Sequence, residues 1–307
     1  MKKSTIELLS CELLEKNKNI INDVDLLARG LIKEIGWHYY VDLIWIVTML
    51  QSNGIEKGST VLDAGAGNGI LQYLLSLYGY NVISVDYSPR NINYLAKKVF
   101  KFNYKENLEK FSNSYISHIK EVGSISYKLR RLWFAINKKQ ISPLIFFSLQ
   151  SRIQKLDYEL GVITIYQADI CQMKEIDSRS IDAIVSLSAI EHIEIDSIKK
   201  AIEEFSRVLK KDHPMIITTS AAKAESWFHE NSKGWCFSRE AIVDFMNINK
   251  DEPSNFFKYD QILNEYKENA FLKENLSSIY YASEKNGMPW GKWDPEYLPV
   301  GIISEAA

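Results

Sequence analysis

The hydrophobic positions follow two spacings, and the change from one to the other marks the predicted elements. Over residues 1–53 they recur every three or four residues, which predicts two or three helices before the break at Asn53-Gly54. Beyond this break, short apolar runs of strand length alternate with helical stretches. The predicted strands are 59–63, 81–86, 162–166, 181–187, 215–219, 256–262 and 298–304.

A glycine-rich turn joins the first of these strands to the next helix. The strand ending at Asp63 runs into Ala64-Gly65-Ala66-Gly67-Asn68-Gly69, a helical stretch covers 70–78, and the following strand ends at Asp86. Strand, turn, helix and strand make a βαβ unit, which requires a parallel sheet with a right-handed crossover. We therefore expect an α/β fold with a doubly wound, Rossmann-like sheet.

Composition agrees with a folded globular chain. Of the 307 residues, 46% are hydrophobic and 25% are charged, which excludes a disordered chain, a collagen-like repeat and a disulfide-rich mini-protein. The net charge of -2 excludes a polycation that coats nucleic acid, and we expect no DNA partner. The charge is unevenly spread, however, because residues 97–155 hold 13 Lys and Arg against 3 Asp and Glu.

Cysteine usage and the apolar runs bear on location. Cys11, Cys171 and Cys236 lie far apart without metal-ligand spacing, which predicts free thiols in a reducing compartment. The N-terminal stretch lacks the apolar run of a signal peptide. The longest apolar run, 43–50, is far too short to cross a bilayer. We expect a cytoplasmic protein without a transmembrane segment.

The glycine turn is suited to a ligand that approaches the backbone closely, although a plain tight turn is the alternative. Dinucleotide sites use G-x-G-x-x-G, and the third glycine of that motif is Ile70 here, which disfavours a nicotinamide oxidoreductase. The register is instead G-x-G-x-G, with Asp63 two residues before the first glycine. The segment VLDAGAGNG resembles motif I of the class I S-adenosylmethionine-dependent methyltransferases.

Three further segments resemble this family at the matching places in the strand order. In the family, an acid at the position of Asp86 holds the ribose hydroxyls of the cofactor, and one at Asp169 receives the adenine amino group. Residues 181–188 resemble motif IV, and Arg207-Val208-Leu209-Lys210 resembles the approach to the fifth strand. The resemblance implies S-adenosyl-L-methionine as cofactor, bound by Asp63, Gly65, Ala66, Gly67, Gly69, Asp86, Tyr87, Asp169, Ile170, Ser186 and Ser188.

Purely structural roles remain open for the three acids. Asp86 and Asp169 could instead cap the helices that follow them. Asp63 either organises the glycine loop from below or touches the ligand. The fold that the resemblance implies is a seven-stranded, mostly parallel sheet whose last strand is antiparallel. We expect a helical N-terminal cap at 1–53 and a methyltransferase domain at 54–307, with a basic, aromatic helical insertion at 101–159.

Methyl transfer to a hydroxyl or amine needs a group that removes a proton. The pair Glu191-His192 after the fourth strand is similar to the ubiquinone-pathway O-methyltransferases, and it supplies the candidate catalytic residues. Some relatives use E-x-x-E-H as metal ligands, but the first Glu position is Ser188 here, so we expect no metal. His192 could instead only shape the pocket. Tyr39 and His229 are weaker candidates for substrate contact, with core packing as the alternative for Tyr39.

These features predict a methyltransferase that acts on a small molecule, at a hydroxyl oxygen, in natural-product or cell-surface glycan or lipid metabolism. The alternatives are an N-methyltransferase or RNA methyltransferase and, in another class, an inactive scaffold subunit that binds the cofactor. The basic insertion is compatible with a lid over an anionic, sugar-linked or lipid-linked substrate, with a homodimer interface, or with a solvated basic face.

Overall fold

The computed structural model describes residues 4–90, 92–105, 143–155, 159–277, 280 and 293–305. Its centre is one mixed sheet with the strand order β1-β10-β7-β6-β2-β3-β5-β4, and β9 pairs with both β7 and β8. The strands are β1 (Thr5–Leu8), β2 (Thr60–Ala64), β3 (Asn81–Asp86), β4 (Phe102–Lys105), β5 (Ile163–Gln167), β6 (Ala183–Leu187), β7 (Pro214–Ala221), β8 (Trp227–His229), β9 (Gly234–Phe237) and β10 (Leu298–Glu305).

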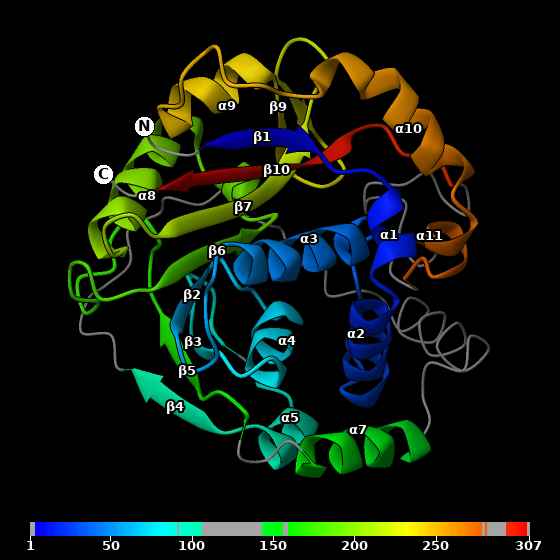
Figure 1. Ribbon diagram of the computed structural model, residues 1–307, viewed down its shortest axis with the longest axis vertical. Helices are drawn as coiled ribbons and strands as arrows, with labels where there is room; N and C mark the ends of the chain where they lie inside the picture. The colour runs from blue at the N-terminus through cyan, green and yellow to red at the C-terminus, as the bar shows by residue number, and fades with distance from the viewer. Residues whose placement is uncertain are drawn as a thin grey trace.

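Helices cover both faces of this sheet, with α3 and α4 on one side and α8 and α9 on the other (Figure 1). The longer helices are α2 (Lys18–Gly30), α3 (Tyr39–Ser52), α7 (Pro143–Lys155), α8 (Ile195–Val208) and α10 (Tyr259–Glu268). The shorter ones are α1 (Glu12–Lys16), α4 (Leu71–Leu77), α5 (Tyr94–Val99), α9 (Arg239–Met246), α11 (Ala270–Glu274) and the 3-10 turns η1 (Ile190–His192) and η2 (Phe256–Lys258).

The βαβ expectation is confirmed. β2 pairs in parallel with β3 on one side and with β6 on the other, and α4 crosses between β2 and β3. The last strand, β10, pairs antiparallel with β7 along its whole length. The Rossmann-like fold is therefore present, with ten strands among the described residues in place of the expected seven.

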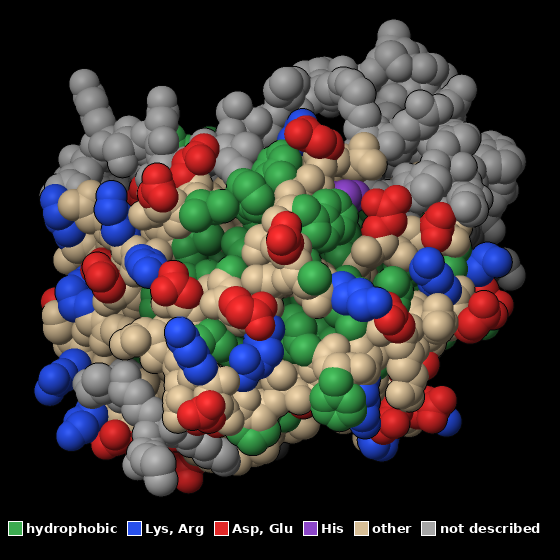
Figure 2. Space-filling view, turned by 90° about the horizontal axis from the view of Figure 1, so that it is seen from above, with side chains coloured by type: hydrophobic (Ala, Val, Ile, Leu, Met, Phe, Trp, Pro, Cys, Tyr) green, Lys and Arg blue, Asp and Glu red, His purple; other side chains and the backbone are tan. Residues whose placement is uncertain are grey.

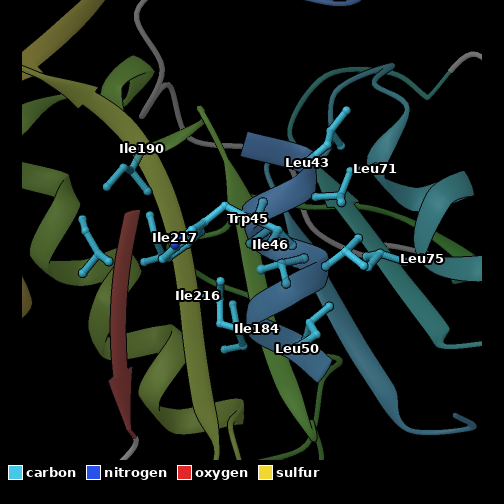
Figure 3. Close-up of a cluster of buried hydrophobic side chains, with 14 of the residues drawn as sticks. Leu43, Trp45, Ile46, Leu50, Leu71, Leu75, Ile184, Ile190, Ile216 and Ile217 are labelled. Atoms are coloured by element: carbon cyan, nitrogen blue, oxygen red, sulfur yellow. The ribbon is translucent and has the colours of Figure 1, made fainter. Parts of the chain in front are cut away.

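Helix α3 forms the centre of the core on one side of the sheet. Figure 3 shows Leu43, Ile46 and Leu50 of this helix between α4 and the side chains of β6 and β7. All three are fully buried. The indole Nε1 of Trp45 donates to Glu7 Oε1 at 2.7 Å, and a Cβ at Gly301 would lie 2.4 Å from the Trp45 ring. Because α3 is held by β1 and β10 as well, its first turn has a defined place beside the carboxyl end of β6.

One predicted strand is wrong. Residues 256–262 form η2 and the start of α10, because Tyr259, Ile262 and Tyr266 recur at helical spacing and are all buried. The β-prone aromatic residues of this stretch suggested a strand, but the spacing over the next turn decides for a helix.

Two segments expected to be helical contain strands. Residues 5–8 form β1, which pairs with β10, so the N-terminal region is not entirely helical. Residues 102–105 form β4, an edge strand parallel to β5, where the insertion was expected to begin as a helix. Residues 143–155 do form a helix, and the remainder of the insertion, 106–142 and 156–158, lies outside the described residues.

One face of the molecule carries exposed charges of both signs. Figure 2 shows the face formed by α9, β1 and α10, where acidic and basic side chains alternate around hydrophobic ones. Within the described residues, every helix is too short or too polar to cross a membrane.

Candidate functional site

The glycine loop lies at the carboxyl end of β2, where Gly65 and Gly67 have left-handed φ angles of 76° and 50°. The amides of Gly65 and Ala66 donate to Val85 O at 3.0 and 2.9 Å. A Cβ on Gly65 would lie 2.3 Å from Ala189 Cβ, so the segment after β6 presses on this glycine. A Cβ on Gly67 would lie 4.0 Å from Asp86 Oδ2 and from the Gly69 amide nitrogen, so this side of the loop is far less crowded than Gly65 and leaves space for a ligand.

Asp86 ends β3 and is bound to this loop. Its Oδ2 accepts from the Gly67 amide at 2.7 Å, and its Oδ1 accepts from the amide and hydroxyl of Ser88 at 2.8 and 2.5 Å. A carboxylate has about four acceptor positions, so these three bonds leave little room for two ribose hydroxyls unless one of them is exchanged. The structure thus brings Asp86 to the loop, and its contact with a cofactor stays a prediction.

Asp63 lies under the loop and is only 1% exposed. Burial raises the pKa of its carboxyl group to about 7, the charge of Arg90 opposes this rise, and Asp86 adds to it. Its Oδ2 has no hydrogen-bond partner among the described residues. Of the two roles expected for Asp63, the buried position favours the one beneath the loop.

The site also contains two cations that sequence reasoning missed. Arg90 folds inward and donates from Nη2 to Ser84 Oγ at 2.9 Å. Lys33, just after α2, donates to the carbonyl oxygen of Asn68 at 2.8 Å, inside the glycine loop. The only sequence signal for Arg90 is its place four residues after Asp86, and Lys33 carries no signal at all, since it lies 35 residues before Asn68 of the loop.

The residues expected around the adenine ring are engaged within the protein. Asp169 Oδ1 accepts from the Cys171 amide at 2.8 Å, within a turn and not at the start of a helix as the alternative above expected. Ile170 is fully buried, so it would contact a ligand only after its neighbours move. The carbonyl oxygen of Tyr87 accepts from Gln167 Nε2 at 3.1 Å. Their contacts with a cofactor stay predictions.

The two serines within the segment that resembles motif IV differ in their surroundings. Ser186 Oγ donates to Ala64 O at 2.9 Å and fastens β6 to β2. Ser188 has a left-handed φ of 46°, which is uncommon for serine, and its buried hydroxyl has no hydrogen-bond partner among the described residues. A strained residue with an unsatisfied hydroxyl at the end of a parallel strand is typical of a ligand site.

Glu191 lies in η1, directly beyond this serine, and is 3% exposed. Its Oε2 accepts from the hydroxyl of Thr219 on β7 at 2.9 Å. Burial raises the pKa of the Glu191 carboxyl group to about 7, and the hydrogen bond from Thr219 partly opposes this rise. A carboxyl group with a pKa near neutrality can take up and release a proton at physiological pH.

His192 points to the β8–β9 hairpin. Its Nδ1 donates to Lys233 O at 2.9 Å, and a Cβ on Gly234 would lie 3.0 Å from the ring. Burial lowers the pKa of His192, which favours the neutral ring at pH 7. The hairpin therefore holds the ring, as the pocket-shaping alternative expects, while a catalytic role stays a prediction.

The first turn of α3 faces Glu191. His38 Nδ1 and Asp42 Oδ2 form a short hydrogen bond, and both residues are buried. The charges of His38 and Asp42 both act on Glu191. Tyr39 belongs to the same group, since the charge of Glu191 adds to the rise that burial causes in the pKa of its hydroxyl. A histidine and an acid four residues apart in an otherwise apolar helix is the signal that could have revealed this pair.

His229 is buried among aromatic side chains, and one of them, Tyr297, also contacts His38. Its Nδ1 is 2.7 Å from Ser232 Oγ, and its ring packs edge-on against Trp227 and Tyr297 at centroid distances of 5.5 and 5.3 Å. Tyr297 also packs against His38, at 5.9 Å. Substrate contact by His229 stays a prediction. In the described part of the chain, no three His, Cys, Asp or Glu side chains gather as metal ligands would.

Some solved structures resemble this fold remotely. Geranyl diphosphate C-methyltransferase from Streptomyces coelicolor A3(2) is 12% identical, with a TM-score of 0.43 over 86% of this chain and 76% of that chain. Magnesium protoporphyrin IX methyltransferase from Synechocystis PCC 6803 is 12% identical, with a TM-score of 0.39 over 86% and 77%. Likenesses this remote say nothing about the acceptor.

The sequence comparisons are more decisive. No curated protein matches the chain significantly. A family model described as a methyltransferase domain matches residues 44–249, which include the glycine loop, Asp86, Asp169 and the segment after β6. The chain therefore belongs to the methyltransferase family that its motifs resemble, as its glycine loop and parallel sheet predict.

Proposed function

We propose that the chain binds S-adenosyl-L-methionine and transfers its methyl group to a hydroxyl oxygen of a small molecule. The observation that carries this proposal is the position of Glu191. A buried carboxyl group with a pKa of about 7 lies three residues beyond Ser188, on the segment that presses on Gly65 of the glycine loop. A candidate proton acceptor, Glu191, and the glycine loop therefore lie on segments that contact each other.

The residues of the loop fit this cofactor. The open side of Gly67, the Asp86 carboxylate and the unsatisfied hydroxyl of Ser188 form a continuous edge at the carboxyl ends of β2, β3 and β6. Ligands of open α/β sheets bind at this edge. Gly67 and Asp86 would hold the ribose part, and Ser188 would face the methionine part. When bound, S-adenosyl-L-methionine supplies a methyl group on a positively charged sulfur.

The residues of this chain would orient the acceptor and take its proton. Glu191 would accept the proton of the acceptor hydroxyl, and Thr219 would hold the carboxylate in place. His38, held by Asp42, faces the same carboxylate and can share the charge change. A small-molecule acceptor suits this group, because aromatic side chains pack closely around it.

Cofactor binding is tested by calorimetry with S-adenosylhomocysteine at pH 7.5. We expect binding, whereas no detectable heat would contradict the cofactor assignment. A homocysteine-release assay with panels of phenols, sugar alcohols, amines and short RNA then identifies the acceptor class. Turnover of amines or RNA alone would replace the oxygen proposal, and cofactor binding without any turnover would favour the scaffold alternative.

The identity of the proton acceptor is tested with two protein variants, assayed with the acceptor molecule that the screen identifies. Glu191→Gln is expected to lower turnover about 10²-fold or more while cofactor affinity is kept, because general base catalysis contributes at least this much. His192→Ala then serves as the comparison. If His192→Ala loses the activity and Glu191→Gln does not, the base is His192, as the sequence motif first indicated.

A further inference from the structure

Arg90 occupies an unusual place, because its guanidinium group lies in the interior between α4 and the sheet. Its Nη2 donates to Ser84 Oγ on β3 at 2.9 Å and to Gln72 Oε1 on α4 at 3.2 Å. The Ser84 hydroxyl also donates to Gln72 Oε1, at 3.0 Å. Arg90 Nε and Nη1 are buried and have no hydrogen-bond partner among the described residues. A buried guanidinium with unsatisfied donors is costly unless it faces negative charge.

Two carboxyl groups supply that charge. Asp63 on β2 and Asp86 on β3 both act electrostatically on Arg90, and Asp63 Oδ2 is itself buried without a hydrogen-bond partner in the described part of the chain. Among the described residues, the other ionisable groups that act on Arg90 or on which it acts are Tyr73 of α4 and Lys33 after α2. Arg90 is thus a buried cation within electrostatic range of both acids, Asp63 and Asp86.

The same network reaches the glycine loop at two points. Gln72 Nε2 donates to Gly69 O at 3.3 Å, and Asp86 Oδ2 accepts from the Gly67 amide at 2.7 Å. Two of the groups that interact with Arg90, Gln72 and Asp86, therefore contact the loop backbone directly. A change at Arg90 would be transmitted to the loop through Gln72 and through Asp86.

We propose that Arg90 is a positioning residue of the cofactor site, which acts as the counter-charge of Asp63 and Asp86 and holds the glycine loop through Gln72. This inference rests on the proposed function, since it assumes that the loop binds S-adenosyl-L-methionine. It adds a residue that the motif does not contain and a reason for its charge.

The physical reason is the repulsion of two carboxylates in a poorly solvated place. Burial raises the pKa of Asp63 to about 7, and of the two neighbouring charges Asp86 raises it further while Arg90 lowers it. Without the guanidinium, the pKa of Asp63 moves higher still, and the group is protonated at neutral pH. A neutral Asp63 would add less negative charge beneath the glycine loop, so the site as a whole would attract the positively charged ammonium group of S-adenosylhomocysteine less strongly.

The experiment measures the dissociation constant of S-adenosylhomocysteine by calorimetry between pH 6 and 8.5. Three proteins are compared: the unchanged chain, Arg90→Lys and Arg90→Gln. Arg90→Gln keeps a donor for Ser84 but removes the charge, and we expect at least tenfold weaker binding at pH 7. The midpoint of the pH dependence, near 7 in the unchanged chain, is expected to move up by about one pH unit. Arg90→Lys is expected to keep most of the affinity of the unchanged chain and a midpoint close to that of the unchanged chain.

Controls separate charge from structure. Arg239→Gln removes an arginine that is likewise held by several hydrogen bonds, to Ser254 Oγ and to the carbonyl oxygens of Lys250 and Glu252, and it is expected to leave binding unchanged. Thermal unfolding of each variant shows whether it is folded. If Arg90→Gln does not fold, Gln72→Leu tests the connection to Gly69 and is expected to weaken binding without moving the pH midpoint.

Each outcome of the calorimetry either supports or overturns the role inferred for Arg90. Unchanged affinity and an unchanged midpoint in Arg90→Gln would overturn the inference while leaving the proposed function intact. Equal losses in Arg90→Lys and Arg90→Gln would also overturn it, because shape and not charge would then matter. Failure of the unchanged chain to bind S-adenosylhomocysteine would remove the proposed function and this inference together.

Discussion

Asp86 binds the glycine loop to the end of β3. One oxygen of its carboxylate accepts from Gly67 and the other from Ser88. The carboxylate shapes the loop, and from the family's pattern we expect it also to hold the ribose of the cofactor. A substitution at this residue removes both at once.

We expect Asp86→Ala to weaken S-adenosylhomocysteine binding by roughly 2 kcal/mol, the cost of losing hydrogen bonds to a charged group. Asp86→Asn keeps one acceptor and should lose less. Isothermal calorimetry measures both, with the exposed Asp196→Ala as control. Equal affinity in Asp86→Ala and the unchanged chain would show that the ligand does not contact the end of β3.

Glu191 makes the stability of the protein depend on pH. Its pKa is raised from 4.5 to about 7 in the folded state, so the folded protein holds this proton more tightly than the unfolded chain. The resulting contribution to stability is complete below pH 4.5 and is lost as the pH rises through 7, and it amounts to roughly 3 kcal/mol.

The measurement is urea unfolding of the unchanged chain and of Glu191→Gln between pH 5 and 8. The free energy of unfolding of Glu191→Gln relative to the unchanged chain should rise over this range, because the variant has no carboxyl group to ionise. A difference that does not vary with pH would mean that Glu191 titrates normally. Asp63→Asn should behave similarly, because burial also raises the pKa of that group to about 7.

The parts of the site that sequence predicts are those that depend on the backbone. Gly65 and Gly67 are recognisable because left-handed φ angles and close approach leave few other residues suitable. Arg90 and Lys33 are not recognisable, because a long flexible side chain reaches its partner only once distant elements have packed. The His38–Asp42 pair is intermediate, since its spacing is local but its direction toward Glu191 is not.

At the scale of elements, local pattern predicts the βαβ unit and fails where pairing is distant. Strands β2, β3, β5, β6, β7 and β10 lie within two residues of their predicted bounds. The strand β1 has only four residues, and its partner β10 lies almost 300 residues later, so no local signal distinguishes it from a helix start. Residues 256–262 show the opposite case. A helical spacing was present in the local sequence, but the aromatic composition led to the prediction of a strand.

The contact between the end of α2 and the glycine loop is the element-scale feature with a direct test. Lys33 follows α2 and donates to Asn68 O, and its Nζ lies 5.9 Å from the centre of the Tyr73 ring. Lys33→Met is expected to weaken S-adenosylhomocysteine binding about fivefold, the equivalent of one lost hydrogen bond. Fluorescence titration measures this, and Lys16→Met, an exposed lysine paired only with Glu12 among the described residues, is the control. An equal effect in both would show that charge in general, and not this contact, matters.

At the scale of the whole molecule, the sheet joins the beginning of the chain to its end. β10 lies between β1 and β7, and Ile6 and Leu8 of β1 are buried. Glu7 holds Trp45 of α3. The strand β1 thus covers an edge of the sheet and supports the helix that presents His38 and Asp42.

Removal of residues 1–9 is expected to lower the free energy of unfolding by several kcal/mol, because three large apolar side chains lose their burial. The exposed edge of β10 should also promote association. Chemical unfolding and light scattering measure the two effects. Glu7→Gln, which weakens only the contact with Trp45, is expected to cost far less, and a truncated protein as stable as the full chain would contradict the role of β1.

The position of β10 has a consequence for the order in which the protein acquires its structure during synthesis. β1 emerges from the ribosome first, but its only strand partner among the described residues, β10, is made last. Residues 5–8 must therefore wait unpaired while β2 to β7 assemble, and contacts of such long sequence separation form slowly. The support that β1 gives to α3 arrives with the last strand, so a nascent chain would hold an assembled glycine loop before His38 and Asp42 are fixed in place.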